Sequence, residues 1–258
     1  LRALVAAGTL FALAAVTRRR LDFSMGVKPI LMVGSTTVAL QLVGLHLGTP
    51  QVGTAMAAII IATIPLFSMA LGRGLGIERI TRPGQIGLAL GAAGIALLVG
   101  FPAEAITPAF LLGCAALVVA CLAAAAGSLY ASVRLKGAGA YEVTAGAFLA
   151  GGLMSLPLLA IAPPPAWPMP ADWFHLVLAG TVMSALTYVT YFGLVSRIGA
   201  TRAISVEFAV TLVAVLIGAL ALGETLTLPQ LAGGLFIVVG CALVLGLWPG
   251  EKARPETG

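Results

Sequence analysis

The chain has 258 residues, of which 60% are hydrophobic and only 9% are charged. A soluble domain of this length cannot bury that excess of apolar surface, so the composition predicts a membrane protein. The 14 Lys and Arg residues outnumber the 9 Asp and Glu residues, but they are scattered among short linkers, which argues against nucleic-acid binding. Low charge, few cysteines and no heptad periodicity argue against a disordered chain, a disulfide scaffold and a coiled coil.

The chain consists almost entirely of apolar runs, each about as long as the roughly 20 helical residues that cross a bilayer. Their short linkers predict a single all-α polytopic membrane protein, embedded in the lipid bilayer, with about nine transmembrane helices. The opening run lacks a positively charged start, so it is not predicted to be a cleavable signal peptide. The apolar runs cover residues 1–17, 29–48, 52–72, 83–101, 107–133, 140–162, 173–196, 203–222 and 228–247.

Basic residues occur in every second linker and are absent from the linkers between. Because cytoplasmic loops carry Lys and Arg in excess, these linkers and the tail at residues 248–258 are predicted to be cytoplasmic. The residues that mark the basic linkers and the tail are Arg18, Arg19, Arg20, Lys28, Arg73, Arg79, Arg82, Arg134, Lys136, Arg197, Arg202, Lys252 and Arg254.

The chain also matches itself after a shift of about 146 residues. The shift superimposes several glycines without a gap, and it places the linker ERITRP (residues 78–83) on ETLTLP (residues 224–229). An ungapped polar match of this kind predicts an internal duplication. The superimposed glycine pairs are Gly34 and Gly180, Gly53 and Gly199, Gly87 and Gly233, and Gly94 and Gly240.

The two predicted copies differ by one helix. Residues 107–247 contain five apolar runs and residues 1–101 contain four, and the shift places the partner of the 107–133 run before residue 1. The sequence therefore predicts inverted five-helix repeats, with nine helices present of an expected ten, in a fragment or from a mis-called start. An odd number of helices per copy makes the copies face opposite ways, as in many secondary transporters, whose substrate site lies between the copies.

The repeated motif E-x-[IL]-T-x-P is typical of a helix start. Its Thr can cap the following helix, its Pro suits the first turn, and its Glu favours the positive helix end. A gating role for Glu78 or Glu224 is the alternative interpretation.

Glu207 is the carboxylate that lies inside an apolar run, away from the linkers. An isolated carboxylate in the membrane is costly unless it is protonated, paired or hydrated, so it predicts a proton-coupling or substrate-cation site. The alternative is a structural carboxyl group that bonds a neighbouring helix or reaches toward the cytoplasm.

Other polar or helix-breaking residues within the apolar runs are candidates for a substrate cavity. Pro65 predicts a bent helix, and the shifted position holds Thr211, which can donate to a free carbonyl. Arg2 is expected on the outer side, where it contacts an anionic substrate group or the lipid interface. The remaining candidates line a central cavity or form interhelical hydrogen bonds. They are Gln41, His46, Ser128, Tyr130, Thr187, Tyr188 and Tyr191.

No motif for catalysis, ATP use or metal binding is present in the sequence. H-E-x-x-H, the P-loop GxxxxGK[ST] and His, Cys or carboxylate clusters with ligand spacing are all absent. Ser128 does not stand in the glycine-flanked setting of a serine nucleophile. The sequence therefore predicts no enzyme activity, no cofactor and no metal.

The chain resembles the EamA-like members of the drug/metabolite transporter superfamily along essentially its whole length. Two stretches and the two-copy layout carry this resemblance. The stretches are GTPQVGTAMAAIIIATIPLFSMALG (residues 48–72) and RIGATRAISVEFAVTLVAVLIGALALGETLTLPQLAGG (residues 197–234). The resemblance implies a ten-helix carrier of the inner membrane with both termini in the cytoplasm. Where the second copy of the family often has Glu-Pro, this chain has Val210 and Thr211, with its carboxylate earlier, at Glu207.

Together these patterns predict a secondary transporter that exports a small organic metabolite, such as an amino acid or a toxic compound, by alternating access. Its partners are the lipid bilayer, the small-molecule substrate and, through Glu207, protons. The alternative is a non-transporting membrane scaffold or an inactive truncated relic.

Overall fold

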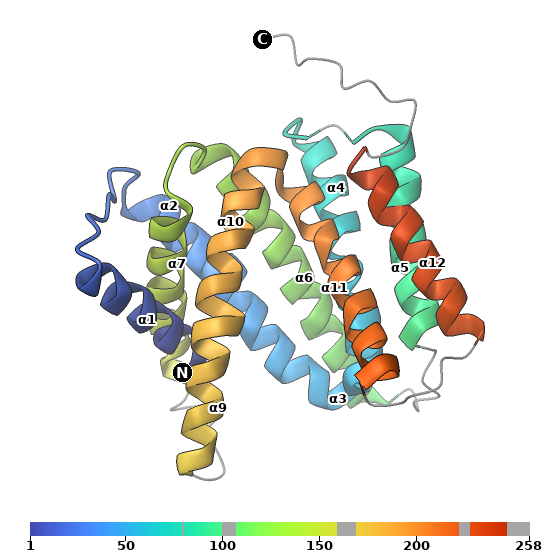
Figure 1. The fold of residues 1–258 in the computed structure, drawn as a ribbon, viewed down its shortest axis with the longest axis horizontal. Helices are drawn as coiled ribbons and strands as arrows, with labels where there is room; N and C mark the ends of the chain where they lie inside the picture. Colours follow the sequence, from blue (N-terminus) through green and yellow to red (C-terminus); the bar gives the residue numbers. More distant parts are fainter. Residues whose placement is uncertain (79, 100–106, 159–168, 222–227, 247–258) are drawn as a thin grey trace. The chain divides into compact units, whose positions relative to one another are not determined.

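A computed structural model describes residues 1–78, 80–99, 107–158, 169–221 and 228–246 (Figure 1). The described part is helical and contains no strand, which confirms the all-helical prediction. Arg79, Glu224 and the tail at residues 248–258 lie outside the described residues. The elements are α1 (Arg2–Val16), α2 (Val27–Val33), the π-helix η1 (Gly34–Leu40), α3 (Gln41–Ile61), α4 (Ile64–Gly74), α5 (Arg82–Val99), α6 (Pro108–Arg134), α7 (Ala140–Ser155), α9 (Pro170–Gly180), the π-helix η2 (Thr181–Leu186), α10 (Thr187–Ile198), α11 (Ala200–Ala221) and α12 (Leu228–Val244).

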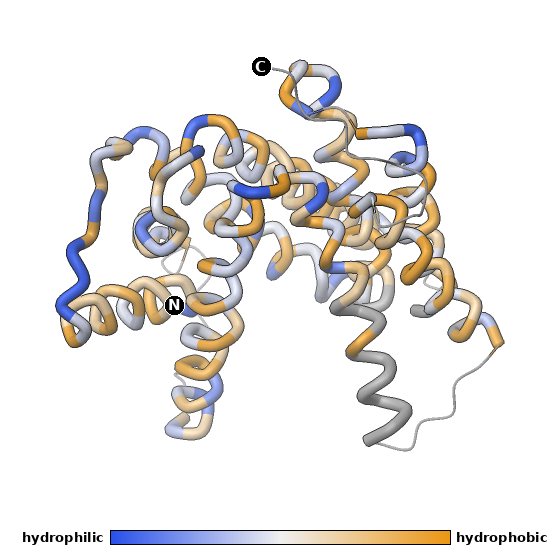
Figure 2. Tube along the Cα trace, turned by 45° about the horizontal axis from the view of Figure 1, so that its top comes forward, coloured by the Kyte–Doolittle hydropathy of each residue, from blue (hydrophilic) through white to orange (hydrophobic). Residues whose placement is uncertain are grey.

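Within the described residues, four helical stretches are long and apolar enough to cross a bilayer, and the second of them contains a short break. They are Val27–Gly53, Met56–Gly74, Pro108–Arg134 and Pro170–Ile198. Arg2–Val16 and Leu231–Val244 are shorter apolar helices. Figure 2 shows hydrophobic positions along the helices and a marked hydrophilic stretch in the segment that joins α1 to α2. The chain is therefore a multi-pass membrane protein, while the count of nine spans stays a prediction.

The helical backbone is interrupted twice in the region before Pro65. Helix α3 is interrupted at Gly53, whose φ is 79°, and the following helix ends at Ile61. A new helix, α4, starts after Thr63, so Pro65 lies in its first turn. There the missing proline N–H leaves no helical hydrogen bond unmade, whereas inside a helix it would. Pro65 thus follows a short break at residues 62–63 within the stretch Met56–Gly74, and the bend that it predicts there stays a prediction.

The chain divides into two compact units that cut across the predicted repeats. Unit 1 contains residues 1–46 and 122–200, and unit 2 contains residues 47–121 and 201–258. The boundaries fall inside α3, inside α6 and after the first residue of α11. Each unit therefore combines helices from both predicted copies.

Helix α7 is at the centre of unit 1. It packs against α1, α2, η1 and α10. Its residues Val143, Ala145, Ala147 and Phe148 are buried in the core of this unit. Small side chains on α7 permit close approach, because a Cβ atom added at Gly151 would lie 2.5 Å from the carbonyl oxygen of Gly34.

Unit 2 is built around the close packing of α5 against α12, which lie side by side in Figure 1. A Cβ added at Gly87 would lie 2.6 Å from the carbonyl oxygen of Gly240, and one added at Gly94 would lie 2.7 Å from that of Gly233. The ring of Phe208 from α11 fills the space beside Gly91. Because lipid gives helices no hydrophobic drive to associate, backbone contact of this kind supplies much of the packing energy.

These contacts are related by the 146-residue shift. Gly87 corresponds to Gly233 and Gly94 to Gly240, so the contact between Gly87 and Gly240 corresponds to the contact between Gly94 and Gly233. In unit 1 the shift places Gly34 on Gly180 and Val5 on Gly151. The contact of Gly34 with Gly151 therefore corresponds to the contact of Gly180 with Val5.

The irregular backbone follows the same shift. The π-helix η1 at Gly34–Leu40 corresponds to residues 180–186, and η2 covers Thr181–Leu186. Gly53 has φ 79° and ψ 159°, while its counterpart Gly199 has φ 86° and ψ 165°. A side chain at either glycine would be strained at this positive φ.

We expect Gly94→Ala to destabilise the protein by about 1–3 kcal/mol, because the new methyl group overpacks the α5–α12 contact. The midpoint of thermal unfolding of the purified protein in detergent should fall. Gly74→Ala is the control, since a Cβ at Gly74 meets no atom within 4 Å. Equal midpoints for the two variants would contradict the importance of this contact.

Candidate functional site

Two of the sequence-predicted candidates, Ser128 and Tyr191, meet in unit 1. The Ser128 hydroxyl oxygen lies 2.6 Å from the Tyr191 hydroxyl oxygen and also donates to the carbonyl oxygen of Ala124 at 2.7 Å. Since the Ser128 proton can serve one of these acceptors, donation to Ala124 leaves the Tyr191 hydroxyl as donor to Ser128. Ser128 is buried and Tyr191 is half-buried. The pair links α6 to α10 through a hydrogen bond between helices.

Aromatic rings extend this pair along α10. Tyr188 makes an edge contact with Phe148 of α7, with ring centroids 4.8 Å apart, and with Tyr191 at 5.7 Å. Tyr191 in turn contacts Phe192 at 5.4 Å. Edge-to-face contacts between aromatic rings stabilise such a cluster beyond the area that they bury. We call Ser128, Phe148, Tyr188, Tyr191 and Phe192 the hydroxyl–aromatic cluster.

The π-helix η1 lies directly beside this cluster. A Cβ added at Gly127 of α6 would lie 2.2 Å from Thr36 Oγ1 and 2.7 Å from Thr37 Cγ2. The Thr36 hydroxyl donates to the carbonyl oxygen of Met32 at 2.7 Å. Glycine next to Ser128 therefore lets irregular backbone approach α6 closely, and π-helical turns occur frequently at functional sites.

Gln41 and Thr187 begin the helices that follow the two π-helices. Gln41 is the first residue of α3 and is half-buried, whereas Thr187 is the first residue of α10 and is exposed. The Thr187 hydroxyl donates to the carbonyl oxygen of Val182, in the preceding π-helix η2, at 3.1 Å. His46 is exposed, and its Nδ1 lies 2.6 Å from the carbonyl oxygen of Leu42. Tyr130 packs against the core of unit 1.

Arg2 contacts the π-helix η2 through its guanidinium. Its Nε donates to Ser184 Oγ at 2.7 Å, and its Nη2 lies 3.5 Å from the carbonyl oxygen of Met183. Ser184 is buried at the midpoint of Pro170–Ile198. Helix α1 packs against η2, which brings Arg2 beside Ser184.

The remaining candidates belong to unit 2. Glu207 is exposed and lies about two turns into α11, because this helix starts at Ala200, three residues before the predicted run. Its neighbours Ser205 and Phe208 are buried. Thr211 lies further along α11, and its side chain is outside the described residues. The structure therefore assembles Ser128, Tyr188 and Tyr191 into one cluster, and it places Glu207, Pro65 and Thr211 in the other unit.

Sequence reasoning missed an ion pair at one end of unit 1. Arg19 Nη2 lies 3.2 Å from Glu142 Oε1, and the Arg19 guanidinium lies 4.5 Å from the centre of the Tyr141 ring. The Tyr141 hydroxyl donates to the carbonyl oxygen of Leu10. The Glu142 side chain is only 6% exposed. The signal available in the sequence was a carboxylate at the start of an apolar run, directly after a basic linker.

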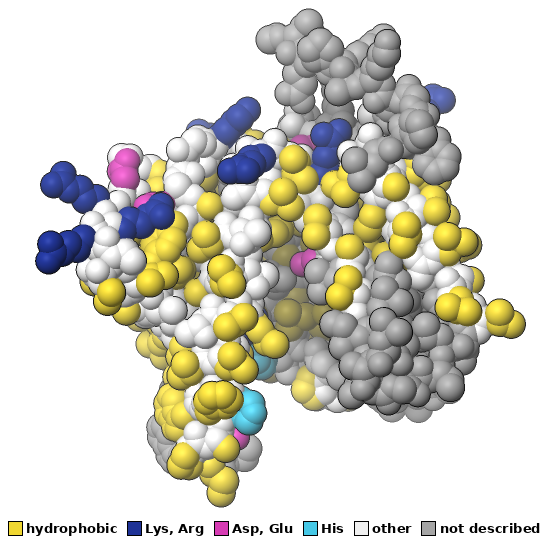
Figure 3. All heavy atoms as spheres, viewed as in Figure 1, with side chains coloured by type: hydrophobic (Ala, Val, Ile, Leu, Met, Phe, Trp, Pro, Cys, Tyr) yellow, Lys and Arg dark blue, Asp and Glu magenta, His cyan; other side chains and the backbone are white. Residues whose placement is uncertain are grey.

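The basic linkers of unit 1 meet at this end. Arg19 joins the α1–α2 linker to α7, and the α6–α7 turn shares a small hollow with the end of α10. Figure 3 shows Lys and Arg side chains at the ends of helices, with hydrophobic side chains over much of the surface between them. The cytoplasmic location of these linkers stays a prediction from the positive-inside pattern.

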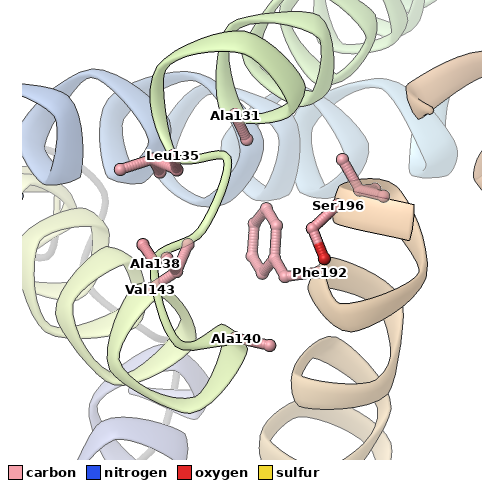
Figure 4. A pocket seen from close by; sticks show the side chains of 8 residues that line it. Ala131, Leu135, Ala138, Ala140, Val143, Phe192 and Ser196 are labelled. Carbon is pink, nitrogen blue, oxygen red and sulfur yellow. The ribbon is translucent and has the colours of Figure 1, made fainter. Parts of the chain in front are cut away.

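The hollow at this end is small and largely apolar. Figure 4 shows the Phe192 ring between α10 and the α6–α7 turn, with Ala131, Leu135 and Ser196 around it. The space measures about 10 Å³. Because ligand sites in proteins usually exceed about 300 Å³, we do not assign this hollow to a solute.

Glu78 connects distant segments of unit 2. Its Oε2 accepts a hydrogen bond from the backbone N–H of Thr201 at 3.1 Å, at the start of α11. Ser68 Oγ lies 2.8 Å from Thr201 Oγ1. The Thr81 hydroxyl oxygen accepts a hydrogen bond from the backbone N–H of Gly84, which confirms that Thr81 caps the start of α5. Glu78 thus stabilises the positive end of another helix.

No group of three or more His, Cys, Asp or Glu side chains suited to a metal ion occurs within residues 1–78, 80–99, 107–158, 169–221 and 228–246. The site consists of hydroxyl, aromatic and backbone groups. Such groups bind a solute through hydrogen bonds and ring contacts. The fold and the cluster define a polytopic helical membrane protein with polar groups inside its helix packing.

Comparison with known proteins identifies the family. Residues 111–246, more than half of the chain, match the EamA-like transporter family, and the chain belongs to this family. It is 25% identical over 245 residues to an uncharacterized transporter of Archaeoglobus fulgidus, covering 93% of this chain and 84% of that one. A protein of known crystal structure shares the fold, with a TM-score of 0.67, 19% identity and coverage of 95% and 96%. The protein is thus a membrane transporter in general terms.

Removing the hydrogen bond between Ser128 and Tyr191 should destabilise unit 1. We expect Ser128→Ala and Tyr191→Phe each to cost about 1 kcal/mol, and the double variant to cost less than their sum. Thermal unfolding of the four proteins in detergent measures this coupling. Tyr130→Phe, which removes a tyrosine hydroxyl elsewhere, is the control, and strictly additive losses would show that the bond contributes nothing.

The ion pair of Arg19 with Glu142 should also contribute to stability. We expect a coupling of about 1 kcal/mol between Arg19→Gln and Glu142→Gln, because one partner is buried and the other is half exposed. The coupling should shrink in high salt. Arg20→Gln is the matched control, and no coupling at low salt would rule out a stabilising ion pair.

Proposed function

We propose that the protein is a secondary transporter of the inner membrane that exports a small organic solute by alternating access. The observation that carries this proposal is the reciprocal relation of the glycine contacts under the 146-residue shift. The shift converts the contact of Gly87 with Gly240 into the contact of Gly233 with Gly94. Two copies related by a twofold axis produce this reciprocal pattern. Inverted repeats of this kind are a recurring plan of secondary transporters.

The irregular backbone supports the same proposal. In a bilayer, non-helical or strained backbone is tolerated where protein or a water-filled cavity surrounds it. The chain carries π-helices at two positions that the shift relates, and the positive-φ glycines Gly53 and Gly199 at two more. Broken helices at matching positions in two copies are a pointer to a transport pathway.

The solute is proposed to contact the hydroxyl–aromatic cluster. Ser128 and Tyr191 supply hydrogen bonds, and Tyr188 and Phe148 supply ring faces and edges. The cluster contains no charged side chain, which favours a neutral or zwitterionic solute such as an amino acid or an aromatic toxic compound. Arg2, beside Ser184 at the midpoint of Pro170–Ile198, is a further candidate contact for an anionic group.

Proton coupling through Glu207 remains part of the proposal. A carboxylate about two turns into an apolar helix is costly unless protonation, pairing or water offsets the charge. Exchange of a proton at Glu207 during the transport cycle would connect solute export to the proton gradient. The basic linkers and the tail are proposed to face the cytoplasm.

Glu207→Gln tests coupling because it keeps the shape of the side chain and removes its charge. In cells expressing the full-length protein, solutes inside and outside are compared without preselecting a target, at several values of medium pH. We expect one solute class to leave the cells only with the intact protein, and its export to lose its pH dependence or stop in Glu207→Gln.

Asp22→Asn is the control for the loss of a carboxylate. The backbone N–H of Ser24 bonds the Asp22 carboxylate at 2.8 Å and lowers its pKa, so Asp22 is ionised at neutral pH. It is fully exposed in the α1–α2 linker, and we expect normal export. Unimpaired, pH-dependent export by Glu207→Gln would contradict coupling through this residue. Equal solute levels in cells with and without the protein would favour the alternative of a non-transporting membrane scaffold or an inactive relic.

A further inference from the structure

Unit 2 has a hollow where α4 ends and α5 begins, apart from the hydroxyl–aromatic cluster. The space within it measures about 490 Å³. This is within the usual range of ligand sites in proteins, about 300–1,000 Å³. Its walls are formed by Met69, Arg73, Gly76, Ile80 and Gln85.

The wall at the end of α4 is a fixed turn. Gly76 has φ 66°, its N–H donates to the carbonyl oxygen of Arg73, and the N–H of Ile77 donates to that of Gly72. These two bonds form a Schellman motif, which satisfies carbonyl groups at the helix end. A Cβ added at Gly76 would meet no atom within 4 Å, so the turn borders open space.

The hollow carries a positive charge that no described carboxylate neutralises. Arg73 is exposed and makes no ion pair with any carboxylate in the described part of the chain. The nearby Glu78 directs its carboxylate to the backbone N–H of Thr201. Gln85 donates one amide N–H to the carbonyl oxygen of Ile80 at 3.2 Å, which holds its side chain at the wall. Its second N–H remains available to an acceptor.

The position and the chemistry of the hollow match an amphipathic anion. It lies between the end of the apolar run at residues 52–72 and the start of the run at residues 83–101, which is headgroup depth in a bilayer. Arg73 and Gln85 offer donors to phosphate oxygens, whereas Met69 and Ile80 offer apolar surface to the adjoining glycerol and acyl groups. Basic pockets between helices at the cytoplasmic face bind anionic lipid headgroups. We propose that this hollow binds the phosphate of an anionic phospholipid.

The test uses the full-length protein in nanodiscs of phosphatidylcholine, with phosphatidylglycerol added in steps. Phosphatidylglycerol should raise the unfolding midpoint of the wild type, and Arg73→Gln should lose at least half of this rise. Arg73→Lys should keep most of it, because the charge remains. Arg134→Gln, which removes an exposed arginine in unit 1, should behave as the wild type. Native mass spectrometry should show fewer retained phosphatidylglycerol molecules on Arg73→Gln.

Three results would overturn the proposal. An equal rise in Arg73→Gln and the wild type would place the lipid effect elsewhere on the protein. An equal rise with inorganic phosphate in pure phosphatidylcholine would make this a site for the free ion. The third result uses Gln85→Leu, which keeps the size of the side chain but removes its hydrogen-bond donors. Unchanged retention of phosphatidylglycerol in Gln85→Leu would contradict the site, and this variant also tests the site if Arg73→Gln folds poorly.

Discussion

Close contact between helix backbones is the constraint on which the rest of this structure depends. In lipid, helices gain little by burying apolar side chains against one another, because the acyl chains are equally apolar. Association then depends on van der Waals contact and interhelical hydrogen bonds. At Gly87, Gly94 and Gly151 a single added methyl group would collide with backbone or side-chain atoms of a neighbouring helix. These positions fix which helices pair and at what distance.

The same contacts explain why the compact units do not coincide with the predicted repeats. Helices α5 and α12 occupy equivalent places in the two predicted copies, and their glycines face each other. In unit 1, α1 and α7 are in contact, and the 146-residue shift places α1 on the second half of α7 and the residues after it. Because helices related by the shift pair with each other, each unit takes helices from both predicted copies. Helices α3 and α6 then run from one unit into the other.

The sequence predicts some features of this protein better than others, for physical reasons. Apolar runs locate helices well, as at 107–133 for α6, because the length of a spanning helix is set by the bilayer. The interruption before Pro65 was placed only roughly, since a proline permits either a kink or a helix start, and packing decides between them. The π-helices had no signal at all, because any apolar sequence accommodates one extra residue in a turn.

For the candidate site, residue type alone identified the participants but not their partners. Ser128 and Tyr191 are far apart in the sequence, and only tertiary packing shows that they share a hydrogen bond. Arg2 was expected at an interface on the basis of its charge, but its contact with Ser184 depends on how α1 packs against η2. The ion pair of Arg19 with Glu142 escaped notice because Glu142 stands at a helix start, where a carboxylate is ordinarily explained by the helix dipole.

The described residues Glu78, Glu142 and Glu207 differ in where they lie along the helices. Glu78 accepts a hydrogen bond from a backbone N–H at the start of α11, and Glu142 forms an ion pair with Arg19 near the start of α7. Glu207 lies about two turns into α11, within an apolar run. A carboxylate near a helix start is explained by the helix dipole, whereas an ionisable side chain within a membrane-spanning segment is costly and is by default a candidate functional residue. Of the three residues, Glu207 is therefore the first to test for a role in coupling.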